Sequence, residues 1–115
     1  MALTSDYELR KAAPMYRGLL QYFPEALAAV AALSLHANEK HNPGEPLHWS
    51  KGKSNDHGDC LVRHLIDAGT WDEDNNCSHT VAVAWRALAL LQTEIEEGRY
   101  PTPEAGPLLL EHEGD

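Results

Sequence analysis

Apolar residues recur at the 3.6-residue spacing of an α-helix in four segments of the chain, whereas no segment shows the clear alternation of a half-buried strand. The four predicted helices cover about residues 5–22, 24–40, 56–68 and 79–97. Pro14 should kink or divide the first helix, Pro24 suits the first turn of the second, and Gly69 can end the third. We therefore expect an all-α protein, a compact bundle of about four helices.

The third and fourth predicted helices differ in how their apolar residues are distributed. The apolar side of the third helix consists of Leu61, Val62, Leu65 and Ile66, and its polar side of Asp56, Cys60, Arg63, His64 and Asp67. The fourth helix is apolar on most sides, which is typical of a helix buried by the protein's own core or by a partner subunit. We expect one domain over residues 1–98 and an irregular, Pro-rich acidic tail over residues 99–115, in which residues 108–110 could dock on a neighbour.

Length and composition limit the class of protein. A chain of 115 residues is long enough for one core but not for two. Its formal net charge of -9 argues against a nucleic-acid-binding module, which needs a basic face for phosphates. The chain has no apolar run of the roughly 18 residues that a membrane span requires, and its first residues lack the basic-then-apolar pattern of a secretory leader. Its two cysteines indicate reduced thiols, so we expect a cytoplasmic protein without nucleic-acid or membrane partners.

Side chains that bind metals or phosphates are concentrated in the middle of the chain. Six of the seven histidines lie between His36 and His79. The candidate ligands for Mg²⁺ or Mn²⁺ are the carboxylates of Glu39, Asp67, Asp72 and Asp74. The candidate phosphate contacts are Lys40, Lys51, Lys53 and Arg63, and Trp49 is the candidate for stacking on a base. Each of these residues alone has an ordinary structural explanation, such as helix capping by Asp72 and Asp74 or solvation of Glu39, so the hypothesis depends on the combination.

A structural zinc site is the alternative. Cys60 and His64 are four residues apart on one helix face, and Cys77 and His79 begin the next helix. Two thiolates and two imidazoles would complete a tetrahedral site. This spacing is not that of a known zinc finger or ribbon, and buried free cysteine is common in cores, so we prefer the carboxylate hypothesis.

An ordered series of short motifs resembles the phage-type dATP/dGTP diphosphohydrolase family, small all-α proteins related to the MazG-like nucleoside triphosphate pyrophosphatases. The matching motifs are Phe-Pro-Glu-Ala-Leu at 23–27, Lys-His-Asn-Pro-Gly at 40–44, Trp49 with Lys51-Gly52, Arg-His-Leu at 63–65, Asp72-x-Asp74 with His79, and Ala-Trp-Arg-Ala-Leu at 84–88. The family pattern usually has Glu where this chain has Asp74, and Gly where it has Asn76, a residue that also tolerates a left-handed turn. Further on, the family often has His and Asn at the positions of Ala82 and Arg86.

The resemblance implies a metal-dependent hydrolase that converts a purine deoxynucleoside triphosphate (dNTP) to the monophosphate and pyrophosphate. Mg²⁺ or Mn²⁺ would be the cofactor, and a homo-oligomer, a dimer or tetramer, is expected, in the host cytoplasm if a phage encodes the chain. His64 and His79 are the candidate catalytic residues, which could bind metal, orient a carboxylate or assist proton transfer. The alternative is a non-catalytic helical oligomer or regulatory protein of the same fold, with the structural zinc site described above.

Overall fold

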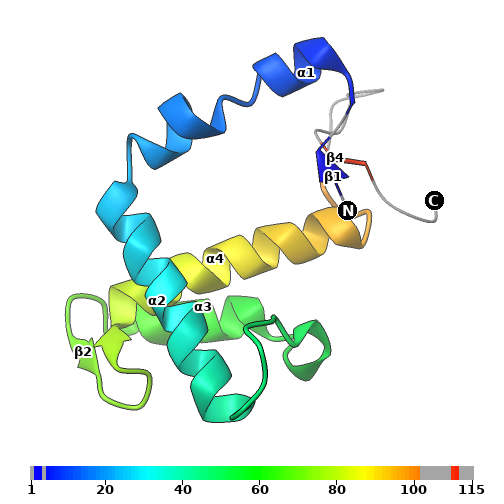
Figure 1. Ribbon diagram of the computed structural model, residues 1–115. Helices are drawn as coiled ribbons and strands as arrows, with labels where there is room; N and C mark the ends of the chain where they lie inside the picture. The colour runs from blue at the N-terminus through cyan, green and yellow to red at the C-terminus, as the bar shows by residue number, and fades with distance from the viewer. Residues whose placement is uncertain (1, 4, 102–109, 112–115) are drawn as a thin grey trace. The chain divides into compact units, whose positions relative to one another are not determined.

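The structure, a computed structural model, describes residues 2–3, 5–101 and 110–111, and it is dominated by helices (Figure 1). Three long helices are present: α2 (Pro24–His41), α3 (His57–Ile66) and α4 (His79–Glu96). The short elements are α1 (Tyr7–Lys11), the π-helix η1 (Tyr16–Leu20), the 3₁₀ turn η2 (Lys51–Lys53), and the two-residue strands β1 (Ala2–Leu3), β2 (Trp71–Asp72), β3 (Cys77–Ser78) and β4 (Leu110–Glu111). The all-α prediction is therefore confirmed.

The chain divides into two compact units, one comprising Met1–Pro24 with Thr93–Asp115 and the other Glu25–Gln92. The predicted single domain over residues 1–98 stays a prediction. Within the described residues, no single helix is long and apolar enough to cross a membrane, and only residues 7–20 and Pro24–His41 taken together, as a broken pair, reach that length and composition.

The first unit contains the divided N-terminal helix and one strand pair. Asp6 caps α1 by accepting a hydrogen bond from the Leu9 backbone N–H at 3.1 Å. The helix ends at Lys11, before Pro14, as predicted, and the next turn is the π-helix η1. The tail was expected to be irregular, but residues 110–111 form β4, which pairs antiparallel with β1 because the backbone groups of both can hydrogen-bond. The rest of the proposed docking segment, residues 108–109, lies outside the described residues.

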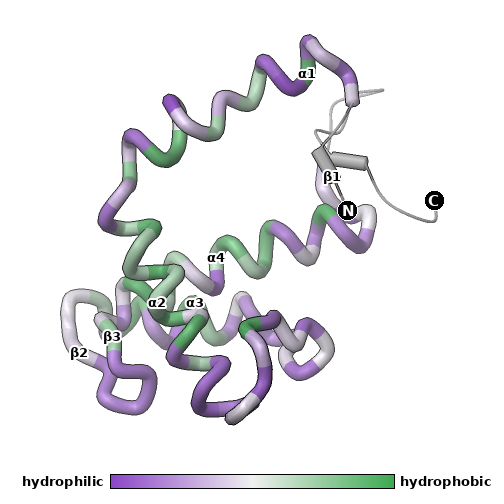
Figure 2. Tube along the Cα trace, in the orientation of Figure 1, coloured by the Kyte–Doolittle hydropathy of each residue, from purple (hydrophilic) through white to green (hydrophobic). Residues whose placement is uncertain are grey.

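The second unit is built on close packing between α2 and α4. Leu33 of α2 is 8% exposed and forms a core cluster with Cys77 and Ala82, against which Trp85 packs. The indole N–H of Trp85 donates to the Ser34 hydroxyl at 2.8 Å, so this contact also satisfies a polar group. Alanines let the helices approach, and Figure 2 shows mainly apolar colouring along α4 and the first part of α2, against polar colouring in the loop after α2.

The orientation of α3 differs from the prediction. Its expected apolar side is largely in solvent, since Val62, Leu65 and Ile66 are exposed, Ile66 by 78%. Cys60, on the expected polar side, is buried instead. The periodicity of a sequence identifies the apolar side of a helix but not the elements that cover it. In this unit the polar side chains of α3 have partners, which are described below. The apolar side of α3 is left free for another surface.

A small hairpin, which the sequence pattern did not predict, lies between α3 and α4. Strands β2 and β3 pair antiparallel, with Asp72 opposite Cys77. The turn between them needs a residue at positive φ, and Asn76 supplies it with φ of 52°. Ser78 then caps α4 by accepting from the Thr80 N–H at 3.1 Å. The sequence missed the hairpin because each strand has only two residues, too few to show alternation.

Truncation of the core leucine should destabilise the second unit far more than truncation of an exposed leucine two positions later. Leu33→Ala removes buried methyl groups and leaves a cavity, which costs about 2–5 kcal/mol. Leu35→Ala, on the same helix at 48% exposure, should cost under about 1 kcal/mol. Urea unfolding followed by circular dichroism measures both, and equal losses would contradict the packing described above.

Candidate active site

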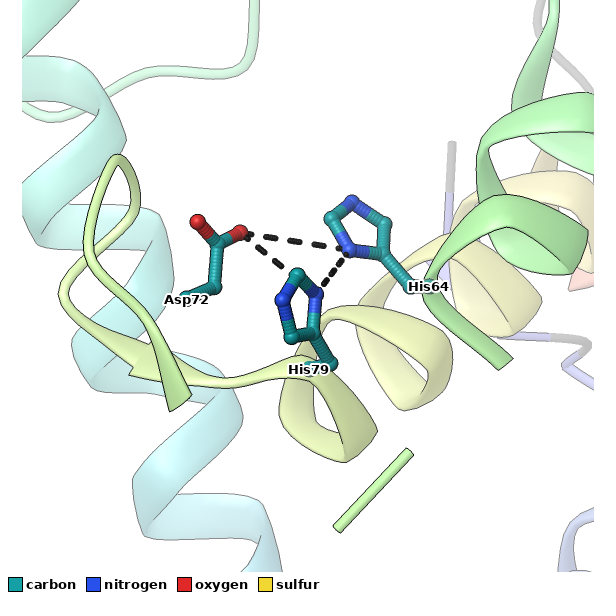
Figure 3. Close-up of side chains that lie close together, drawn as sticks. All are labelled: His64, Asp72 and His79. Carbon is teal, nitrogen blue, oxygen red and sulfur yellow. Dashed lines mark hydrogen bonds and ion pairs between the residues drawn. The ribbon is translucent and has the colours of Figure 1, made fainter. Parts of the chain in front are cut away.

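Two imidazoles and one carboxylate converge where α3, the hairpin and α4 meet (Figure 3). His64 comes from the last turn of α3, Asp72 from β2, and His79 is the first residue of α4. The two Nδ1 atoms are 2.9 Å apart. The Oδ2 atom of Asp72 lies 3.9 Å from Nδ1 of His64 and 3.8 Å from Nδ1 of His79. We call these three residues the His–Asp–His group.

Hydrogen bonds from the hairpin turn hold the Asp72 carboxylate in place. It accepts from the backbone N–H groups of Asp74 at 3.0 Å and Asn75 at 3.4 Å, and from the Asn75 side-chain amide at 2.7 Å. The Lys40 ammonium of α2 donates to the Asp74 carbonyl at 3.1 Å, which ties the turn to a second helix. His79 is fixed from the other side, because its backbone N–H donates to the Thr70 carbonyl at 2.9 Å.

The surroundings of the group favour the protonation states that metal binding requires. Burial alone would raise the pKa of Asp72, but the hydrogen bonds from Asn75 and the nearby His79 outweigh it and lower this pKa below its usual range. Burial lowers the pKa of His64, and the like charge of a protonated His79 lowers it further. At neutral pH the group therefore contains an ionised carboxylate and a neutral His64, which are ligand forms.

The donor set fits a divalent transition-metal ion. Metal–ligand bonds of roughly 2.0–2.1 Å place neighbouring ligand atoms roughly 3 Å apart, and here the ligand atoms all lie within 4.8 Å of one another. Small side-chain movements would bring the three atoms to a common ion. Three protein ligands leave coordination positions for water or substrate, as in catalytic sites. Two nitrogens with one oxygen suit Mn²⁺ or Zn²⁺ better than Mg²⁺, which prefers oxygen ligands alone.

A pocket of about 640 Å³ adjoins this group within the second unit. His64 and Asn75 contribute to its wall, so the pocket and the His–Asp–His group share residues. Among the described residues, no carboxylate lines the pocket, although the whole chain has 18 acidic residues. Lys53 and Arg86 do line it, so the pocket is positively charged within an acidic protein.

Three rings form an aromatic wall of the pocket. The centroids of Trp49 and Trp85 are 5.7 Å apart in an edge-to-face arrangement, and His57 lies 6.3 Å from Trp49 and 6.2 Å from Trp85. The Lys51 ammonium lies 5.0 Å from the Trp49 ring centroid. Such a wall offers a flat apolar surface to a base. Trp49, which the sequence predicted as a stacking residue, lies in this pocket with a second tryptophan.

Arg86 is a pocket residue that the sequence did not identify as functional. Its Nη1 atom donates to the Ser54 hydroxyl at 3.0 Å and to Nδ1 of His57 at 2.9 Å. His57 is buried, and this burial, together with the nearby guanidinium, lowers the pKa of His57. In the sequence Arg86 was only a departure from a family pattern. Its position seven residues after His79, on the same face of α4, was the available signal.

The structure brings together His64, Asp72 and His79 but not the other predicted metal ligands. Glu39 is exposed on α2, Asp67 is exposed at the end of α3, and Asp74 contributes backbone atoms only. Of the four predicted carboxylates, Asp72 is the one that lies beside imidazoles, and a metal role for the other three stays a prediction.

Of the predicted phosphate contacts, Lys53 lines the pocket, whereas the other three make contacts elsewhere. Lys40 is bonded to the hairpin turn, Lys51 sits over Trp49, and Arg63 donates to the Cys60 sulfur at 3.0 Å. Among the residues that line the pocket, the cations are Lys53 and Arg86.

The four-ligand zinc set is not assembled either. Cys77 packs in the core with Leu33 and Ala82, and burial raises the pKa of its thiol, which disfavours the thiolate that zinc needs. Cys60 is buried beside Arg63, and the metal-type group contains neither cysteine. Only the two histidines of that set, His64 and His79, lie together.

Fold and site together define a small helical protein with a carboxylate and two imidazoles beside an aromatic, positively charged pocket. Residues 6–101 match the family model described as dATP/dGTP diphosphohydrolase, N-terminal. The chain therefore belongs to this family, as its motifs suggested. Comparison with curated proteins and with solved structures found no match.

Proposed function

We propose that this protein hydrolyses a purine dNTP to the monophosphate and pyrophosphate. The observation that carries the proposal is a pocket lined by two tryptophans and two cations, and by no carboxylate of the described residues, that shares His64 with the His–Asp–His group. A flat ring and a polyphosphate on one ligand match this lining. The family description, a diphosphohydrolase, supports the same reaction.

Both halves of the substrate have matching groups in the lining of the pocket. Stacking of a base on an aromatic side chain contributes about 1–3 kcal/mol, and Trp49 and Trp85 offer such surfaces. The phosphates carry the negative charge that Lys53 and Arg86 complement. Because the rest of the protein is acidic, this pocket is where a polyanion is least repelled.

Hydrolysis forms a bond between a water oxygen and the α-phosphorus and breaks the bond from that phosphorus to the bridging oxygen of the β-phosphate. His64, Asp72 and His79 would hold a divalent ion, which would supply positive charge near the phosphoryl oxygens and lower the pKa of bound water. When Nδ1 of His64 binds the ion, the other ring nitrogen carries the hydrogen, so we assign His64 a hydrogen bond donated to a phosphate oxygen. The proton of the attacking water passes to solvent water. Asp72 orients the two imidazoles and would supply the negatively charged ligand. Of the expected cofactors, the nitrogen donors favour Mn²⁺ over Mg²⁺.

We further propose that the protein is a homo-oligomer in which the apolar side of α3 contacts a second copy. Val62, Leu65 and Ile66 form an exposed apolar surface on one helix, and such surfaces on soluble proteins mark interaction sites. A second copy offers the same apolar surface, as a two-fold dimer requires.

Hydrolysis is tested by incubating the purified chain with each dNTP and either Mn²⁺ or Mg²⁺, and measuring pyrophosphate and monophosphate. We expect release from a purine dNTP, faster with Mn²⁺. Asp72→Asn should reduce the rate by about 100-fold or more, because it removes the charged ligand of the group. Asp59→Asn, the same change at an exposed position on α3, is the control. Absence of pyrophosphate with every nucleotide would refute the proposal.

Assembly is tested by size-exclusion chromatography with light scattering. The wild-type mass should be a multiple of 12.7 kDa, and Ile66→Glu should shift the protein towards the single-chain mass because it places a charge in the apolar contact. A wild-type mass of one chain at tens of micromolar would contradict the oligomer.

A further inference from the structure

The pocket contains a guanidinium that neighbouring residues hold in a defined orientation. Arg86 uses one nitrogen, Nη1, for both of its hydrogen bonds, to the Ser54 hydroxyl and to Nδ1 of His57. Ser54 in turn donates to the Asp56 carboxylate at 2.8 Å, so its hydroxyl has a fixed direction. The guanidinium carbon also lies 5.4 Å from the Trp85 ring centroid. These three contacts leave the planar group little freedom to rotate.

The positive charge of Arg86 meets neutral partners in these hydrogen bonds. His57 accepts through Nδ1, which requires the unprotonated nitrogen, and the serine hydroxyl carries no charge. The nearest acid along this chain of contacts is Asp56, which is exposed and does not line the pocket. A guanidinium in a concave, mainly apolar site, which no carboxylate lines in the described part of the chain, attracts an anionic ligand.

The position of Arg86 on α4 relates it to the His–Asp–His group. His79 and Arg86 are seven residues apart, two helical turns, and so lie on one face roughly 10 Å apart along the axis. Ala82 lies between them on the same face. It is buried and lines the pocket with a single methyl group. A polyphosphate chain that contacts the His–Asp–His group at one end can extend over Ala82 towards Arg86.

We propose that Arg86 is the anion anchor of the pocket, a substrate-binding residue whose guanidinium holds the terminal phosphates that leave as pyrophosphate. This assignment rests on the proposed function for the identity of the substrate, but not for anion binding itself. His57 is the positioning residue, because its Nδ1 acceptor sets the orientation of the guanidinium. Lys53 is the weaker cation, since its ammonium is exposed and already donates to the Asn42 side chain at 3.2 Å.

Tripolyphosphate binding tests the anchor without any catalytic step. The full chain is titrated calorimetrically with sodium tripolyphosphate in the presence of EDTA, which removes metal ions from the comparison. Arg86→Gln should bind about 10- to 100-fold more weakly than wild type, the loss expected for charge-assisted hydrogen bonds. Arg86→Lys, which keeps the charge but not the fork, should be intermediate. Arg17→Gln, an exposed arginine outside the pocket, is the control and should match wild type.

The positioning role of His57 is tested in the same titration. His57→Asn keeps an acceptor near the Nδ1 position and should retain most of the affinity, whereas His57→Leu should lose it about as Arg86→Gln does. Circular dichroism and thermal melting establish that each variant is folded. If Arg86→Gln does not fold, the single variants Arg86→Lys and His57→Leu provide the comparison. Wild-type affinity for tripolyphosphate in both of them would contradict the anchor.

The outcomes separate the anchor from the hydrolase proposal. Wild-type tripolyphosphate affinity in folded Arg86→Gln, or no tripolyphosphate binding by the wild type, overturns the anchor. A change in preference between dATP and dGTP with unchanged tripolyphosphate affinity also overturns it, because Arg86 would then contact the base. Arg86-dependent tripolyphosphate binding by a protein that hydrolyses no dNTP supports the anchor and refutes only the proposed reaction.

Discussion

A buried carboxylate costs several kcal/mol unless hydrogen bonds and positive charge compensate for its lost hydration. Asp72 is such a carboxylate, and the arrangement of residues where α3 and α4 meet depends on this compensation. The requirement is met locally, by N–H groups that a tight hairpin turn directs at the carboxylate. The same turn needs Asn76 at positive φ, and it is tied to α2 through Lys40. With Asp72 held in this way, His79 lies next to it in the first turn of α4, and His64 approaches both residues from the end of α3.

The pocket adds the property that a metal-type group alone lacks, which is selectivity for a ligand. An acidic protein repels polyanions over most of its surface, so under the proposed function a polyanion would bind in the cavity that contains Lys53 and Arg86 and that no carboxylate of the described residues lines. The tryptophan rings next to these cations would favour a ligand with a flat ring as well as phosphates. His64 belongs to both the pocket wall and the His–Asp–His group, so a ligand in the pocket would lie next to that group.

Sequence patterns predicted the parts of this protein that depend on neighbours in the chain. Helix α2, its Pro24 start and the division of the first helix near Pro14 follow from local rules, and the structure has them. The motif containing Asp72 and His79, with Arg63-His64 before it, located the centre of the site. Asn76 at positive φ was likewise expected from its place in the motif.

The features that depend on tertiary packing could not be predicted in the same way. Carboxylates at Glu39, Asp67 and Asp74 look equivalent to Asp72 in a sequence, but only the fold determines which one imidazoles surround. The covered side of α3 depends on partners from other elements. Arg86 gained significance only when the fold placed it against His57, 29 residues earlier in the chain.

The central claim is that two imidazole nitrogens and the Asp72 carboxylate hold one divalent ion. Pulsed electron paramagnetic resonance of the Mn²⁺-loaded chain measures this most directly, because nitrogen ligands produce hyperfine couplings and oxygen ligands do not. The account predicts couplings from two histidine nitrogens, which ¹⁵N-histidine labelling shifts and of which His79→Ala removes one. Mn²⁺ bound without any nitrogen coupling would contradict it and would point to a site made of carboxylates alone.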